Sequence, residues 1–217
     1  MRSRFDEQLG LLHRKMIEMG AECESIIALA AKALLDGSVE DAEKVKRQGP
    51  NIDRMEREIE AICLKLLLQQ QPVAKDLRTV SAALKMITDM ERIGDQAEDI
   101  AEIIVYLGGR TGKECVGIRK MAEATIKMVT DSIDAYVRRD TALSRAVCAY
   151  DDVVDAAFAQ IKSTLIGMIA ENAADGEYAL DLLMIAKYFE RIGDHAVNIA
   201  EWVEFSVTGV HKGEASV

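Results

Sequence analysis

Apolar residues recur at helical spacing along most of the chain, and their stripes predict six helices. On the first helix, which begins near Arg4, the apolar positions on one face are Phe5, Leu9, Leu12 and Met16. The helix is expected to end near Gly37, because glycine readily adopts the left-handed conformation that closes a helix. The pattern is that of an amphipathic helix with one face against a core.

The remaining stripes predict five further helices. The second is predicted securely from Asn51, a candidate N-cap, with an earlier start left open, and its apolar stripe is Met55, Ile59, Ile62 and Leu66. Gln71 and Pro72 interrupt it, and a third helix is expected over residues 74–107. The second half repeats the plan over residues 116–138, 141–172 and 177–208, with a turn at Asp175 and Gly176. Short connections favour antiparallel neighbours, so each half should be an up-down-up bundle.

The sequence contains an internal repeat with a period of 99 residues. Residues 84–102 read LKMITDMERIGDQAEDIAE, and residues 183–201 read LMIAKYFERIGDHAVNIAE. Ten of these nineteen positions are identical, whereas unrelated sequences of average composition would share roughly one. The same offset relates Asp53 to Asp152 and Glu56 to Asp155. The sequence therefore predicts an all-α protein of two tandem three-helix bundles, residues 1–109 and 114–217, separated by a glycine-rich segment.

Composition supports this fold class and excludes one kind of partner. Only 2 prolines and 5% aromatic residues disfavour an all-β fold. The net charge of −10 at pH 7 makes nucleic acid an unsuitable partner, because phosphate binding needs a positive surface.

The cysteines and the apolar runs bear on the cellular compartment. Cys23, Cys63, Cys115 and Cys148 lie more than thirty residues apart, which fits free thiols rather than a zinc knuckle or a disulfide framework. No uncharged stretch approaches the roughly 20 residues that span a bilayer. We therefore expect a cytoplasmic protein without direct membrane insertion, which reaches a membrane only through partners.

Acidic residues recur on one face of the third helix at i, i+4, i+7 and i+11, namely Glu91, Asp95, Glu98 and Glu102. A solvated amphipathic helix is the simplest explanation of such a stripe taken alone. Two features favour ligand binding instead. Like charges at i,i+4 repel by a few tenths of a kcal/mol, and the paired acids recur in both repeats while neighbouring surface positions differ, such as Thr88 against Lys187.

Carboxylates from two antiparallel helices would suit Mg²⁺, Mn²⁺, Fe or Zn²⁺. The sequence predicts a first metal site made of Asp53, Glu56, Glu91, Asp95 and Asp99. It predicts a second site made of Asp152, Asp155, Glu190 and Asp194. Within the stripes, Gly94 and Gly193 favour close helix packing, and Arg92 and Arg191 suit counter-ions to the acids. A surface position is expected for His195, and a role as a ligand is the alternative.

Motifs for enzymatic chemistry are absent from the sequence. It has neither a nucleophile motif nor a phosphate-cradling glycine loop. Ferritin-like di-iron oxidases need Glu-x-x-His, but the residues three before His13, His195 and His211 are Gly10, Ile192 and Thr208. A carboxylate-bridged metal oxidase and a purely structural helical bundle stay as alternatives to a regulatory metal-binding protein.

The two copies ERIGDQAEDIAE (91–102) and ERIGDHAVNIAE (190–201) resemble the PhoU family, as do QQPVAKDLRTVSAALK (70–85) and RSRFDEQLGLL (2–12). The resemblance covers roughly residues 2–210 and implies two three-helix repeats. The family's acidic motif corresponds to Glu91/Asp95 and Glu190/Asp194, which in some members hold multinuclear iron or zinc clusters. In this sequence Asn198 stands where the first repeat has Asp99.

The resemblance also implies a function without a reaction. PhoU-like proteins link a phosphate ABC transporter, through its ATPase, to a sensor histidine kinase. They repress phosphate-starvation genes when phosphate is plentiful and restrain uptake. We therefore expect a non-enzymatic, homodimeric regulator of phosphate signalling.

Overall fold

The structure is a computed structural model that describes residues 2–70, 74–111 and 117–210. Within these residues the chain forms six α-helices and a single 3₁₀ turn, η2 (Ala173–Asp175), and no strand. The helices are α1 (Arg2–Asp36), α2 (Val39–Gln70), α3 (Ala74–Leu107), α4 (Ile118–Arg138), α5 (Thr141–Glu171) and α6 (Gly176–Thr208). The prediction of an all-α fold with two three-helix repeats is confirmed.

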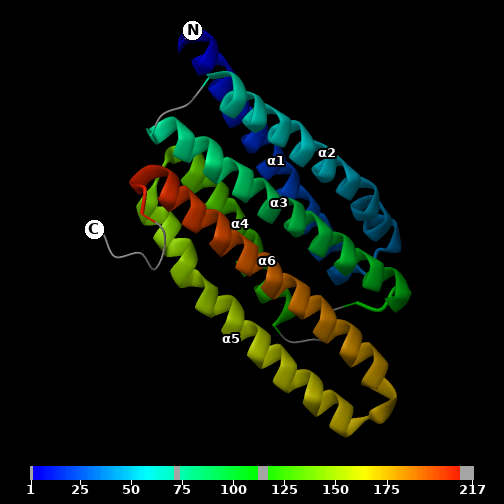
Figure 1. The fold of residues 1–217 in the computed structure, drawn as a ribbon. Coiled ribbons are helices and arrows are strands. Elements are labelled where there is room, and N and C mark those ends of the chain that lie inside the picture. The colour runs from blue at the N-terminus through cyan, green and yellow to red at the C-terminus, as the bar shows by residue number, and fades with distance from the viewer. Residues whose placement is uncertain (1, 71–73, 112–116, 211–217) are drawn as a thin grey trace.

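The helices form two layers (Figure 1). One layer holds α2, α3, α6 and α5 side by side in that order, and α1 and α4 cover its back. Each repeat is a triangle of helices, and the repeats join where α3 packs on α6 and α1 on α4. A hydrogen bond of 2.7 Å between His13 Nδ1 and the Tyr136 hydroxyl spans the α1–α4 contact. The symmetry-related helices α3 and α6 therefore lie at the centre of the molecule.

The core follows the apolar stripes that the sequence predicts. On α3, Ile93, Ile100 and Ile104 are buried, and on α6 the corresponding Ile192 and Ile199 are buried. Full burial of an aliphatic side chain contributes about 1.5–3 kcal/mol. The acidic stripe of each helix is thereby turned away from the core, toward the groove beside the neighbouring α2 or α5.

Helix α2 takes the earlier start that the sequence left open, and only the capping role predicted for Asn51 is wrong. Asn51 is not an N-cap, because α2 begins at Val39 and continues through Pro50. The Ser38 hydroxyl accepts a hydrogen bond of 3.1 Å from the Asp41 backbone N–H, and Asp41 lies in the first turn, where the helix dipole favours acids. Proline weakens a helix interior locally, but burial of one face over 32 residues keeps this helix continuous.

The other helix ends agree closely with the sequence pattern. Gly37 closes α1 with a φ of 65°, as its position predicts. Gly176 belongs to α6 rather than to the preceding turn. The predicted break at Gln71 and Pro72, and residues 112–116 of the predicted segment between the repeats, lie outside the described residues, so the domain limits stay a prediction.

The cysteines and helix α5 bear on the expected cellular compartment. Cys23 and Cys63 are buried, and Cys148 is half-buried; Cys115 lies outside the described residues. Helix α5 is the one described helix whose length and composition would suffice to cross a membrane. In the fold it packs on α4 and α6, and such a helix alone is weak grounds for membrane insertion.

Candidate metal centre

Three predicted ligands of the first repeat come together between α2 and α3. Carboxylate oxygens of Asp53, Glu91 and Asp95 all lie within 4.8 Å of one another, and the three residues are half-buried. Asp53 comes from α2, and the other two lie one turn apart on α3. Among the described residues, this is the one group of three potential ligands that comes so close. An oxygen set of this kind suits a hard divalent cation.

The close crossing of α2 and α3 positions these carboxylates. Gly94 is buried beside Ile52, and a Cβ atom at position 94 would lie 3.0 Å from the Ile52 Cδ1 atom. Asp53 follows Ile52 directly, and Gly94 lies between Glu91 and Asp95 in the sequence. The absence of a side chain at position 94 therefore brings the backbone of α2 close enough for all three acids to meet.

Burial and mutual repulsion act on this acidic cluster. Burial raises the pKa of the Glu91 carboxyl above its usual value, and the charge of Asp95 raises it further. Burial also raises the pKa of Glu56, while a hydrogen bond from the Thr88 hydroxyl opposes that shift. Arg92 lies on the solvent side, 2.9 Å from Asp95 and 3.4 Å from Glu91. Arg92 therefore acts as a counter-ion, as expected, yet the cluster keeps excess negative charge.

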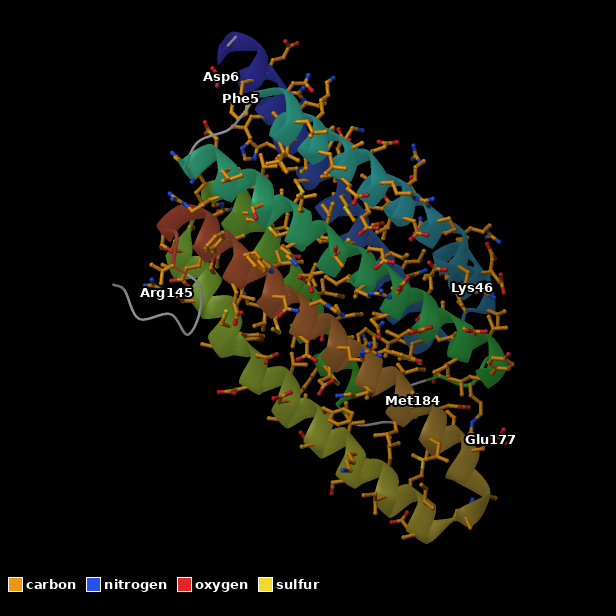
Figure 2. The ribbon with its side chains drawn as sticks, in the orientation of Figure 1. Phe5, Asp6, Lys46, Arg145, Glu177 and Met184 are labelled. Carbon is orange, nitrogen blue, oxygen red and sulfur yellow. The ribbon has the colours of Figure 1, made fainter. Side chains whose placement is uncertain are left out.

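A cavity of about 370 Å³ adjoins the cluster toward the end of α3. Figure 2 shows Lys46 in the first half of α2, at the edge of the bundle where α3 ends. Gln96 is only 4% exposed, and its Oε1 atom has no hydrogen-bond partner in the described part of the chain. An unpaired buried acceptor in an acidic cavity favours a cation or another donor as ligand. The lining residues are Lys46, Arg92, Asp95, Gln96, Glu98, Asp99 and Glu102.

Glu98 is held in this cavity by a second close approach of the two helices. A Cβ atom at Gly49 of α2 would lie 1.5 Å from the Glu98 Oε1 atom. The Glu98 carboxylate therefore lies over the bare backbone of α2, a place that only glycine leaves open. Burial, followed by the charges of Asp53, Asp95 and Asp99, raises the pKa of Glu98. In the second repeat the corresponding positions are Cys148 and Val197, so this part of the site is unique to the first repeat.

Of the other residues predicted for the first site, Glu56 and Asp99 lie beside the group of three. Glu56 is close enough to raise the pKa of Glu91, although burial is the largest cause of that shift. Asp99 lines the cavity, and burial followed by the charge of Asp95 raises its pKa. The structure thus gathers all five predicted residues in one region, three of them within ligand distance of a common point.

The predicted ligands of the second repeat are arranged differently. Asp152, Asp155 and Asp194 are exposed, and Glu190 is half-buried. The Lys187 ammonium forms an ion pair with the Glu190 carboxylate. The acids of this repeat form no group of three within 4.8 Å in the described chain. The second site therefore stays a prediction from the sequence.

Sequence reasoning missed Asp151, the most perturbed acid of the second repeat. Burial, then the charges of Asp155, Asp194 and Glu190, raises the pKa of Asp151 to about 6. Its carboxylate lies against Gly193 of α6, with Oδ1 3.6 Å from a Cβ position there. The 99-residue offset aligns Asp151 with Ile52. An acid in place of a buried isoleucine is the signal that could have revealed it.

The expectation of a surface position for His195 is wrong. His195 Nδ1 lies 2.9 Å from Asp89 Oδ1, and the His195 side chain is 17% exposed. The Asn198 amide donates a second hydrogen bond of 2.9 Å to the same Asp89 oxygen. His195 and Asn198 come from α6, and Asp89 comes from α3. This polar cluster therefore joins the two repeats instead of extending either acidic site.

Comparisons with known proteins agree with the repeated architecture. The family model described as "PhoU domain" matches residues 16–104 and 118–203. The chain is 35% identical to a phosphate-specific transport system accessory protein PhoU homologue of Clostridium acetobutylicum, over 94% of each chain. It is 32% identical to a homologue of the same description from Pseudomonas aeruginosa, over 94% of this chain and 86% of that protein.

Comparison with solved structures also finds PhoU proteins. The crystal structure of PhoU from Pseudomonas aeruginosa superposes with a TM-score of 0.91 at 32% identity, over 95% of this chain and 100% of that one. A phosphate transport system regulatory protein PhoU from Streptococcus pneumoniae, 23% identical, shares the fold with a TM-score of 0.86 over 95% and 98% of the two chains. With two matched repeats, relatives aligned along nearly the whole chain and a shared fold, this chain belongs to the PhoU domain family.

Proposed function

We propose that the protein is a non-enzymatic accessory regulator of phosphate transport. The observation that carries this proposal is the full-length similarity to relatives that are named phosphate-specific transport system accessory proteins. The acidic sites contain carboxylates, an unpaired amide and basic counter-ions. This set lacks a nucleophile paired with a base, which acyl or phosphoryl transfer would require, so the site suits binding rather than a reaction.

The proposed partners are the ATPase of a phosphate ABC transporter and a sensor histidine kinase. In this role the protein, as a homodimer in the cytoplasm, holds phosphate-starvation signalling off when phosphate is plentiful. The net charge of −10 supports docking on basic protein surfaces rather than on anionic lipid or nucleic acid.

We further propose that a divalent or higher-valent cation binds between α2 and α3. Asp53, Glu91 and Asp95 would hold it, since their oxygens already lie within 4.8 Å of one another. A cation at this point would remove the repulsion that adds to burial in raising the pKa of Glu91, and it would tie the two helices together. Oxygen ligands discriminate weakly among Mg²⁺, Mn²⁺, Fe and Zn²⁺. The role of the cation would be structural, because metal binding to the folded state stabilises that state.

A deletion strain tests the regulatory proposal. Phosphate-regulated transcription is measured in phosphate-rich medium with the gene present, deleted and restored. We expect transcription to rise in the deletion strain and to fall again on complementation. Unchanged transcription after deletion would contradict the proposed regulatory function. Oxygen consumption by metal-loaded protein would favour the alternative of a metal oxidase.

Complementation with the double variant Glu91→Gln/Asp95→Asn then shows whether regulation depends on the proposed metal centre. Chelator-treated protein is first compared with metal-loaded protein by thermal unfolding, and metal should raise the melting temperature of the parent only. If the variant restores repression fully, the metal centre is dispensable for regulation. If chelator leaves the melting temperature of the parent unchanged and no metal is bound, the acidic stripe is a solvated face.

A further inference from the structure

The internal repeat places two sets of acids at equivalent positions, so each set serves as a control for the other. The first cluster is Asp53, Glu91 and Asp95, and the second cluster is Asp152, Glu190 and Asp194. Position 88 of α3 corresponds to position 187 of α6 through the 99-residue offset. In the first repeat this position is Thr88, which is exposed and lies close enough to Glu56 to affect the pKa of that carboxyl. In the second repeat it is Lys187. The same place in the fold therefore carries a neutral hydroxyl in one cluster and an ammonium group in the other.

Lys187 directs its charge into the groove between α6 and α5. Its Nζ atom forms an ion pair with Glu190, whose side chain is only 15% exposed. The same atom lies 5.5 Å from the centre of the Phe158 ring of α5, a favourable position for an ammonium group. The residue that corresponds to Phe158 in the first repeat is Ile59, which offers no such face. Contacts with both helices thus hold Lys187 over the second acidic cluster.

The ammonium also acts on the neighbouring acid. Burial and Glu190 raise the pKa of Asp194, and Lys187 is the first group that opposes this shift. Arg92 and Arg191 occupy the same position in the two repeats, but of these two arginines only Arg92 forms ion pairs, among the described residues, with the acids of its own repeat, Glu91 and Asp95. The first cluster combines three close carboxylates with the unpaired, buried Gln96 Oε1 atom. Arg92 balances part of this charge from the solvent side, and a divalent cation would neutralise the excess negative charge that remains.

We propose that Lys187 makes the two clusters unequal: its ammonium group takes, in the second repeat, the place that a divalent cation takes in the first. This inference rests on the metal centre proposed above. The chain would then bind metal between α2 and α3 only, and the second repeat would be held together by its own side chain, independently of metal supply. The threonine or lysine at this position supplies the charge difference between the two clusters, within grooves that other residues shape.

The test counts bound Mn²⁺ on chelator-treated protein, by the loss of the free-ion electron paramagnetic resonance signal. Glu91→Gln/Asp95→Asn should abolish binding, and Glu190→Gln/Asp194→Asn should leave the bound amount unchanged. Lys187→Thr, which copies Thr88, should add a second site and roughly double the Mn²⁺ bound. The control Lys162→Thr removes an exposed lysine from α5 and should leave binding at the parent value.

The reciprocal change keeps the proposal testable if Lys187→Thr does not fold. Thr88→Lys should lose most Mn²⁺ binding while its far-ultraviolet circular dichroism stays helical. Equal losses from the two double variants, or unchanged binding in both a folded Lys187→Thr and a folded Thr88→Lys, would overturn the role of Lys187 and leave the metal centre standing. A parent protein that binds no Mn²⁺ would overturn both.

Discussion

Gly94 of α3 packs against Ile52 of α2 so closely that a Cβ atom at position 94 would lie 3.0 Å from the Ile52 Cδ1 atom. The Cγ2 and Cβ atoms of Ile52 would lie at 3.3 and 3.5 Å. In the second repeat, Gly193 has its nearest neighbours at 3.6 Å, and one of them is Asp151. The helix crossing beside the acids is therefore packed more tightly at Gly94 in the first repeat than at Gly193 in the second.

Gly94→Ala should destabilise the protein, and Gly193→Ala should not. Alanine gains about 1 kcal/mol over glycine in a helix interior, but overpacking a core typically costs about 1–3 kcal/mol. Ile52 cannot readily turn its Cγ2 atom away from position 94, because a β-branched side chain in a helix has one strongly preferred χ1 angle. We expect Gly94→Ala to lower the free energy of unfolding by about 1 kcal/mol, and Gly193→Ala to raise it by up to about 1 kcal/mol. Urea denaturation measures both, and equal changes in the two variants would contradict the packing difference.

Gly49→Ala should weaken metal binding without unfolding the protein. The added methyl group would occupy the place of the Glu98 carboxylate, 1.5 Å from its Oε1 atom, so the Glu98 side chain must move away. The matched control is Gly167→Ala on α5, where no atom lies within 4 Å of the added Cβ. Both variants gain helix propensity, and only Gly49→Ala should raise the apparent dissociation constant for Mn²⁺, severalfold. Calorimetric titration compares them, and identical affinities would mean that Glu98 takes no part in the site.

Asp89→Ala should loosen the contact between the repeats. It removes the acceptor of both His195 and Asn198, each 2.9 Å from Asp89 Oδ1. Leaving a buried donor unpaired costs about 1–3 kcal/mol; His195 is largely buried, whereas the exposed Asn198 amide can bond to water, so we expect a loss of about 1 kcal/mol. The control Asp131→Ala breaks a pair with Lys127 one turn away on α4 and should cost no more than about 0.5 kcal/mol. Chemical denaturation measures the free energy of unfolding of both variants. Similar decreases in the two would show that the α3–α6 cluster stabilises the protein no more than a surface ion pair does.

Asp151→Asn should stabilise the metal-free protein at pH 8 but not at pH 4. Asp151 has a folded-state pKa raised from 3.8 to about 6 by burial and by its acidic neighbours. The folded state therefore binds more protons than the unfolded state between these values, and stability falls as pH rises through this window. Asparagine removes that loss, so the advantage of the variant should appear above about pH 6. Denaturation in chelator at both pH values tests this, with the exposed Asp152→Asn as control; an equal advantage at pH 4 would contradict the titration.

The sequence determines the helices and the duplication by itself. Helical spacing of apolar residues depends only on local geometry, so the α3 limits, the buried Ile93 and Ile100, and the equivalence of Glu91 with Glu190 can all be predicted. Asn51 shows the limit of local rules. A capping residue after a proline predicts a helix start, yet burial of one face of α2 overrides both signals, because tertiary packing outweighs local preferences of about 1 kcal/mol.

Only the tertiary structure decided how the two acidic sets differ. The repeat predicts two equivalent sites, but the distances between α2 and α3 and between α5 and α6 depend on residues that the motif does not include. Gly49 and Ile52 shape the first groove, whereas Asp151 and Lys187 shape the second. Repulsion among carboxylates changes steeply with distance at low effective dielectric. A shift of a few ångströms, or one ammonium group from the neighbouring turn, therefore separates a motif with three close carboxylates from one with an internal ion pair.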